Sequence, residues 1–307
     1  MGRRMKLIIL VATFVVVSGS VIIMGFLPYL ATGSVINRHI DYETVYVPED
    51  WGLEVKPLFL ETKDGYRLAA WDVESEDPRA VVIFLGGLTQ PPVSAFWGHA
   101  RLLAEHGYNS LLIELRSHGE SSGEQAYLGY AEHLDVLAGI DYVKEHYPNV
   151  PIIACGADLG GVAAINAAGL YSGLAGIISI GAFSSWADLF ADNLYFSGAP
   201  LAFAVLEKPF VNLYTLLKFG PESRALVPKR QISNLGSRPA LLMHAKDDPF
   251  VSVLNLERII ESLRGKAEHL ESWIRPGDDH LVSSDFLHPE NDPEYTERIL
   301  SFLERHF

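Results

Sequence analysis

Short apolar runs alternate with amphipathic stretches along most of the chain. Two of these runs flank Lys63-Asp64-Gly65, a turn sequence that predicts their pairing as a β-hairpin. Six further compact runs have the composition of buried strands. The predicted strands are 55–61, 66–72, 80–85, 110–115, 151–155, 175–180, 239–244 and 269–274.

The segments between the later runs carry a helical pattern. Leu134, Leu137, Ile140 and Val143 recur every three residues and would line one side of a helix. Buried strands separated by helices indicate an α/β fold, in which a mostly parallel sheet has helices on both faces. Because the chain shows no internal repeat and no low-complexity linker, we predict a single domain over residues 38–307.

The stretch 183–236 breaks the alternation, because it holds many aromatic residues and no clear strand. An insertion of this size late in such a sheet is either extra helices of the core or a lid over a site. A lid of this composition favours a small lipophilic substrate, since ligand sites are mostly apolar. We expect Trp186, Tyr195 and Tyr214 to line the pocket beneath it.

The first 37 residues differ from the rest of the chain. No charged residue lies between Lys6 and Arg38, and residues 7–30 form an apolar stretch long enough to cross a bilayer, which takes about 20 residues. Basic residues precede this stretch, which predicts a single-pass signal anchor with a cytoplasmic N-terminus and an extracytoplasmic domain. The alternative is a signal peptide cleaved near Ala31 or Gly33, followed by secretion.

Composition narrows the possible functions. The 307 residues are 49% apolar and 20% charged, which excludes a disordered chain. The net charge of −14 argues against nucleic acid as a partner, because the phosphate backbone would repel such a protein. One cysteine excludes an intramolecular disulfide and any multi-cysteine metal site. Nothing in the sequence calls for a cofactor, and the oligomeric state stays open.

The strongest chemical motif lies in residues 151–164, which read PIIACGADLGGVAA. A buried strand runs into Gly156-Ala157-Asp158-Leu159-Gly160 and then into an alanine-rich helix, with the G-x-nucleophile-x-G spacing of a nucleophile elbow. Such a turn lifts its middle side chain, here Asp158, above the sheet. The amides at the start of the helix would favour negative charge at that point.

Together with four other landmarks, this elbow resembles the α/β-hydrolase superfamily, most closely its lipase-like and serine-aminopeptidase-like branch. The resemblance covers residues 55–307 and implies an α/β-hydrolase fold with a helical lid, preceded here by one transmembrane helix. The other landmarks, in chain order, are Asp64-Gly65 in the hairpin, FLGGL at 84–88, ELRSHGES at 114–121, and the pair HAKDD at 244–248 and GDDH at 277–280.

The resemblance also implies a catalytic set. Carried over by position, Asp158 is the nucleophile, Asp248 the acid and His280 the base, in the chain order expected for this fold. The backbone amides of Leu88 and Leu159 would form the oxyanion hole.

The chain departs from this family at two positions. Gly86 stands where the family has its oxyanion histidine, and Asp158 replaces the usual serine. A carboxylate attacking an ester would give a high-energy anhydride, so a serine-esterase mechanism is not available. The carboxylate of Asp158 can instead displace a leaving group at a saturated carbon and form an alkyl ester, which water then hydrolyses. This is similar to the haloalkane dehalogenases and epoxide hydrolases, but Leu159 replaces the halide-binding Trp of the former, and the oxyanion turn lacks the Pro of the latter.

Three interpretations of Asp158 therefore stay open: a working nucleophile, an inactive elbow in a binding protein, and a replaced serine in an esterase-, lipase- or peptidase-like hydrolase. Residues 278–280 and Asp248 lack the paired spacing of metal ligands, so no metal is expected. Arg116 and His118 are expected to brace a loop.

Overall fold

The computed structural model describes residues 2–263 and 269–307, apart from the side chains at positions 16, 17 and 20–22. Eight strands form one sheet in the order β1-β2-β4-β3-β5-β6-β7-β8, and each coincides with a predicted strand to within two residues at either end. The strands are β1 (Lys56–Glu61), β2 (Arg67–Val73), β3 (Val81–Leu85), β4 (Asn109–Ile113), β5 (Ile152–Ala157), β6 (Gly176–Ile180), β7 (Ala240–Ala245) and β8 (Leu270–Arg275).

The sheet is mostly parallel, as the buried runs predict. Strands β1 and β2 form the expected antiparallel hairpin, with Glu61 opposite Arg67, and β2 also pairs antiparallel with β4. From β4 to β8, all neighbouring strands are parallel. Every residue of β3, β4, β5, β6 and β7 is buried, which is the burial that helices on both faces produce.

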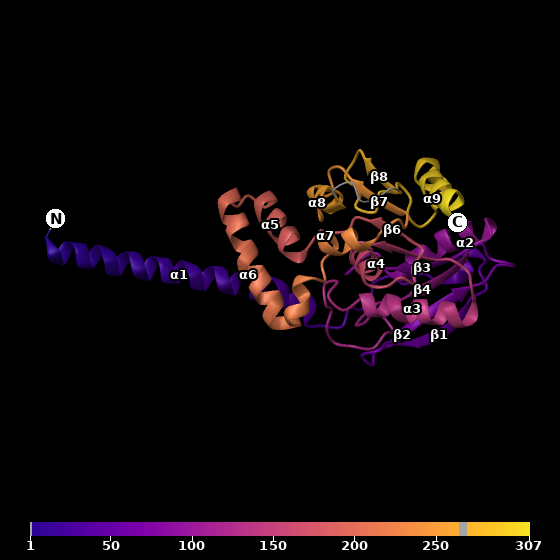
Figure 1. Cartoon of the computed structure of the whole chain (residues 1–307), viewed down its shortest axis with the longest axis horizontal. Helices are drawn as coiled ribbons and strands as arrows, with labels where there is room; N and C mark the ends of the chain where they lie inside the picture. The colour runs from indigo at the N-terminus through magenta and orange to yellow at the C-terminus, as the bar shows by residue number, and fades with distance from the viewer. Residues whose placement is uncertain (1, 264–268) are drawn as a thin grey trace.

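Helices cover the sheet on both sides (Figure 1). One core cluster joins the sheet to α3 (His133–His146), α4 (Leu159–Leu170) and α8 (Leu254–Leu263). The other joins it to α2 (Trp97–Glu105) and α9 (Pro293–His306). Helix α3 contains the predicted three-residue apolar repeat, and three of the four repeat positions, Leu137, Ile140 and Val143, are buried.

Within the described residues, the stretch 183–236 contains helices and no strand. Its main elements are α5 (Trp186–Phe196), α6 (Leu201–Phe219) and α7 (Pro228–Gln231). Ser185 caps α5 by accepting a hydrogen bond from the amide of Asp188, and Gly198, with φ of 98°, lies in the turn between α5 and α6. Helices α5 and α6 lie together between the sheet and the N-terminal helix (Figure 1), and we call this stretch the cap.

The N-terminal helix α1 (Arg3–Ile36) extends away from the sheet, and α6 contacts it near the body of the molecule (Figure 1). Many of its large apolar side chains are exposed, including Leu7, Leu10 and Phe14. In the part of the chain that the structure describes, no helix combines the length and the apolarity needed to cross a membrane. The predicted span 7–30 is thus unsupported, and five of its side chains lie outside the described residues.

The last turns of α1 belong to the folded body. Ile36 is fully buried in a cluster with Leu128, Tyr130 and Val227. Thr32 is also fully buried, and its hydroxyl oxygen accepts a hydrogen bond from the indole nitrogen of Trp186 at 3.1 Å. The end of α1 therefore contributes to the core of the region that includes the cap.

Candidate active site

The predicted elbow is present at the junction of β5 and α4. Asp158 has φ of 50° and ψ of −114°, a conformation that is strained for a residue with a side chain. The two flanking glycines make the turn sterically possible. A Cβ on Gly156 would lie 2.2 Å from the carbonyl carbon of Gly160, and one on Gly160 would lie 2.3 Å from the carbonyl oxygen of Leu85.

The two other predicted catalytic residues meet at the ends of the last two strands. Nδ1 of His280, after β8, donates a hydrogen bond of 2.6 Å to Oδ2 of Asp248, after β7. The second carboxylate oxygen, Oδ1, accepts from the amides of Phe250 at 2.8 Å and Val251 at 2.9 Å. The Asp248 side chain is fully buried. Asp248 is therefore fixed on both sides and fixes the orientation of the imidazole in turn.

The carboxylate of Asp158 lies in the predicted oxyanion hole. The amide of Leu88 donates to its Oδ2 at 2.9 Å, and the nearby amide of Leu159 favours the charged form of the carboxylate. An amide expected to hold a substrate oxygen therefore binds an oxygen of the protein itself. This placement leaves the other carboxylate oxygen, Oδ1, as the candidate attacking atom.

The charges of the three residues are linked. Burial raises the pKa of Asp158, although the charge of His280 and the two amides act in the opposite direction. Burial alone would lower the pKa of His280, but the hydrogen bond to Asp248 and the charge of Asp158 raise it above the ordinary value. Burial also disfavours the charged form of Asp248, yet His280 holds its pKa below the ordinary range. His280 therefore interacts with two carboxylates: it is hydrogen-bonded to Asp248, which orients it, and it is influenced by the charge of Asp158.

The oxyanion turn is held by a histidine whose contact the sequence does not reveal. His118 has Nε2 2.8 Å from the carbonyl oxygen of Leu88 and Nδ1 2.7 Å from that of Arg116. Burial lowers the pKa of His118, so the neutral ring donates to one of these carbonyls at a time. Arg116 is buried and paired with Asp64 and Asp135, which gives this loop a rigid base.

Gly181 is a second site residue that sequence reasoning missed. It follows β6 with φ of 62°, and a Cβ there would lie 2.9 Å from Cε1 of His280. The missing side chain therefore allows the imidazole to pack against the backbone. The only sequence signal is a glycine directly after a predicted strand.

The three residues expected in the lid are not grouped as one pocket wall. Trp186 and Tyr214 pack against the cluster that also contacts Leu88, and Tyr214 lies edge-on to Tyr29 of α1, with ring centroids 6.3 Å apart. Tyr195 is 46% exposed and contacts Phe196. In the described part of the chain, no aromatic contact joins Tyr195 to Tyr214.

Known proteins share this architecture. The fold is similar to that of the Pyrococcus furiosus esterase Pf2001, with a TM-score of 0.66, 23% identity, and coverage of 88% of this chain and 98% of the esterase. The acylaminoacyl peptidase of Pyrococcus horikoshii aligns with a TM-score of 0.62 and 19% identity, over 83% of this chain and 42% of the peptidase. The uncharacterised protein YqkD of Bacillus subtilis (strain 168) is 23% identical over 255 residues, which are 82% of this chain and 80% of YqkD.

A family model described as serine aminopeptidase, S33, matches residues 76–234. The match includes Leu88 and Asp158 and ends before Asp248 and His280. It spans more than half of the chain, and the fold agrees with it. The protein therefore belongs to the serine aminopeptidase S33 family and is a hydrolase of the α/β-hydrolase superfamily.

Proposed function

We propose that this protein hydrolyses a small lipophilic substrate through an alkyl ester formed on Asp158, with His280 as the base and Asp248 as the orienting acid. The observation that carries the proposal is the hydrogen bond from the Leu88 amide to Oδ2 of Asp158. It holds the carboxylate in one orientation, next to an imidazole already fixed by Asp248.

In the first step, Oδ1 of Asp158 attacks a saturated carbon of the substrate. A C–O bond forms, the bond from that carbon to its leaving group breaks, and the leaving group departs with the electron pair. The Leu88 and Leu159 amides act here by orienting the carboxylate. Burial supports the attack as well, because it removes water from the ionised oxygen.

In the second step, His280 removes a proton from a water molecule, whose oxygen attacks the carboxyl carbon of Asp158. Negative charge then develops on Oδ2, which already accepts the Leu88 amide hydrogen bond. The intermediate collapses, the alkoxide leaves with the proton from His280, and Asp158 is left as a carboxylic acid. Loss of that proton to solvent restores the carboxylate. Ester formation also removes the negative charge of Asp158, one of the influences that raise the pKa of His280, so more of the imidazole is in the neutral form that can accept a proton from water.

The decisive experiment is a single turnover in ¹⁸O-water with a panel of alkyl halides and epoxides. Attack of water on the carboxyl carbon places the heavy oxygen in Asp158, and mass spectrometry of its peptide detects it. For any substrate that is turned over, an unlabelled Asp158 would overturn the covalent route. His280→Gln should accumulate the alkyl ester as added mass, whereas Asp158→Asn should give neither ester nor product.

A second candidate is acyl transfer after restoration of the serine, because the family is one of serine hydrolases and the base and acid are already paired. In the native chain, Oδ2 of Asp158 fills the position that a substrate oxyanion would need. Asp158→Ser should free the Leu88 and Leu159 amides and yield activity on short acyl esters. A folded but inert Asp158→Ser variant would count against this candidate. Ligand binding without turnover in the native chain, unaffected by His280→Ala, would identify a binding protein.

We also propose that residues 7–30 attach the protein to a membrane, with the N-terminus in the cytoplasm. The support is the sequence pattern and the exposed apolar side chains of α1, such as Leu10 and Phe14. After carbonate washing, the full chain should remain in the membrane fraction and a Leu10→Lys/Phe14→Lys variant should be released. Equal release of both proteins, or recovery of a chain shortened near Ala31, would contradict the anchor.

A further inference from the structure

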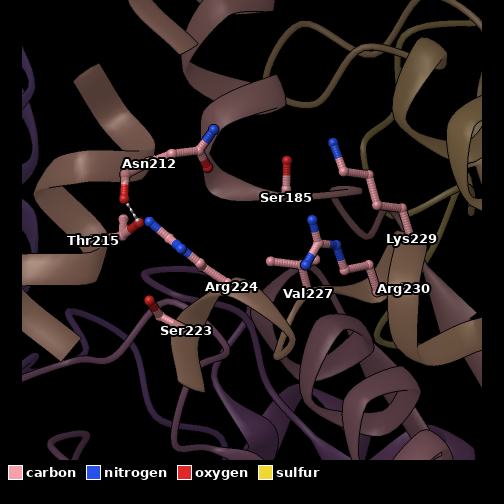
Figure 2. Close-up of a pocket in the computed structure, with 8 residues that line it drawn as sticks. All are labelled: Ser185, Asn212, Thr215, Ser223, Arg224, Val227, Lys229 and Arg230. Carbon is pink, nitrogen blue, oxygen red and sulfur yellow. Dashed lines mark hydrogen bonds between the residues drawn. The ribbon is translucent and has the colours of Figure 1, made fainter. Parts of the chain in front are cut away.

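A polar cavity lies within the cap, apart from the three candidate catalytic side chains. It has a volume of ≈ 210 Å³ and is bounded by α6, α7, the short helix at 221–224 and the loop before α5. Figure 2 shows Lys229 and Arg230 running in the same direction from α7. Arg224 extends toward Thr215, away from Arg230 in this view. We call this cavity the cap pocket.

The cap pocket collects positive charge in an acidic protein. Three of its lining residues are Arg224, Lys229 and Arg230, while the whole chain carries a net charge of −14. Lys229 is compensated, because it pairs with Asp188. Arg224 and Arg230 are exposed, and among the described residues neither forms a salt bridge or a side-chain hydrogen bond. Two guanidinium groups therefore border the cavity with donors that only solvent or a ligand can use.

The hydroxyl groups of the lining are committed elsewhere. Ser185 donates to Asp188, Thr215 donates to the Asn212 carbonyl, and Ser223 donates to the Gly220 carbonyl. All three hydroxyl side chains are at least 95% buried. With their protons used in this way, the hydroxyl oxygens can act toward a ligand only as acceptors, which suits the hydroxyl groups of a ligand rather than its anionic oxygens. Arg224 and Arg230 are therefore the residues that could bind an anion in this pocket.

We propose that the cap pocket binds the phosphate group of a small organic phosphate, with Arg224 and Arg230 as its ligands. A phosphate monoester carries a charge of about −1.5 to −2 at neutral pH, which matches two unpaired guanidinium groups better than a carboxylate does. The volume far exceeds the ~30 Å³ share of one water molecule, so a short hydroxylated chain fits beside the phosphate.

The cap pocket adjoins the surroundings of the oxyanion turn. Val227 lines the pocket and packs in the cluster that contacts Leu88. Ser185 lines the pocket as well, and the next residue, Trp186, packs against that same cluster. A bound phosphate would therefore lie one layer of side chains from the candidate active site. Its binding does not require turnover, so its test is independent of the chemistry proposed for Asp158.

Calorimetric titration of the full chain, in a non-ionic detergent and at fixed ionic strength, tests the site. The probes are inorganic phosphate and glycerol phosphate. We expect saturable binding, with a dissociation constant raised about 10-fold or more in Arg224→Gln/Arg230→Gln. The control Lys63→Gln/Lys218→Gln removes the same charge outside the pocket and should bind as the native chain does. No saturable binding, or equal weakening in both double variants, would overturn the proposal.

Vesicles separate the two sources of such a phosphate. Phosphatidylcholine vesicles provide the reference, and phosphatidic acid vesicles offer a phosphate monoester headgroup. Extra binding to phosphatidic acid that the Arg224→Gln/Arg230→Gln change abolishes would support the pocket and assign it a lipid headgroup. Binding of glycerol phosphate without extra binding to phosphatidic acid vesicles would support a phosphate site in the cap pocket and assign it a soluble ligand. Extra vesicle binding that persists in the double variant would overturn a lipid role for the pocket.

Discussion

The Leu88 amide donates a 2.9 Å hydrogen bond to Oδ2 of Asp158, so the elbow residue fills the oxyanion hole of its own site. In a serine hydrolase, these amides receive the oxygen of the substrate. Here they instead orient the carboxylate. The relationship supports the proposed attack by Asp158 over attack on a substrate carbonyl, because an oxygen of Asp158 occupies the oxyanion hole.

The charge of Asp158 should be visible in the titration of His280. We expect Asp158→Asn to lower the pKa of His280, because that charge is one of the influences that raise it. Nuclear magnetic resonance of the imidazole protons against pH measures the change. Asp279→Asn is the matched control, since the charge of Asp279 raises the pKa of His280 less than that of Asp158 does. Equal shifts in the two variants would contradict the arrangement.

The hydrolysis of the alkyl ester should increase with pH and then level off, because neutral His280 is the reactive form. Asp248→Asn removes the hydrogen-bonded charge that raises the pKa of His280, so the increase should move to lower pH. The plateau should fall about 100-fold or more, since the imidazole loses its orienting partner. Rapid-quench measurement of ester decay from pH 5 to 9 checks both effects. An unmoved midpoint would refute the role of Asp248.

His118 should act as a positioning residue through Leu88. We expect His118→Ala to slow ester hydrolysis about 10-fold with little change in KM. Displacing the Leu88 amide should reduce the rate less than removing an oxyanion-hole donor altogether. His118→Gln keeps a donor and should recover part of the rate. The control His133→Ala removes a histidine whose hydrogen bond goes to Tyr171. A loss of similar size in that control would indicate general damage to the fold.

The end of α1 should contribute to stability. We expect Ile36→Ala to lower the free energy of unfolding by about 2–5 kcal/mol, the range for truncating a fully buried Ile. Leu7→Ala is the control, because Leu7 is 60% exposed on the same helix. Denaturant titrations of both variants in one detergent compare them. A difference below about 0.5 kcal/mol would show that the last turn of α1 is not part of the cooperative core.

Local patterns were sufficient for the sheet. The strands are short and bounded by turn residues, and the central ones are wholly buried, so each apolar run predicts one strand. The turn at Lys63-Asp64-Gly65 predicts the hairpin. The elbow was also predictable, since its glycines follow from the close approach of β5 and α4. Residues from three separate strand ends, among them Asp248 and His280, were assigned through a family resemblance and not through spacing.

Contacts between distant segments were not predictable from the sequence. The hydrogen bond between His118 and the Leu88 carbonyl joins residues 30 positions apart, and neither residue type predicts it. The cap pocket likewise forms only when the short helix at 221–224 and α7 bring Arg224 and Arg230 to the same cavity. The exposure of Tyr195 beside Phe196 was likewise not indicated by its place in the aromatic stretch.

The burial of Thr32 and Ile36 bears on any processing of the N-terminus. A peptidase cut after Ala31 would place a new terminal ammonium group on Thr32, directly beside the Trp186 indole. A cut after Gly33 would place the charge two residues before Ile36. The end on Thr32 would lie among buried side chains, which is costly for an unpaired charge, whereas the end on Ser34 would be exposed. A cut after Ala31 would therefore loosen the layer that borders the oxyanion turn, and a cut after Gly33 would disturb it less.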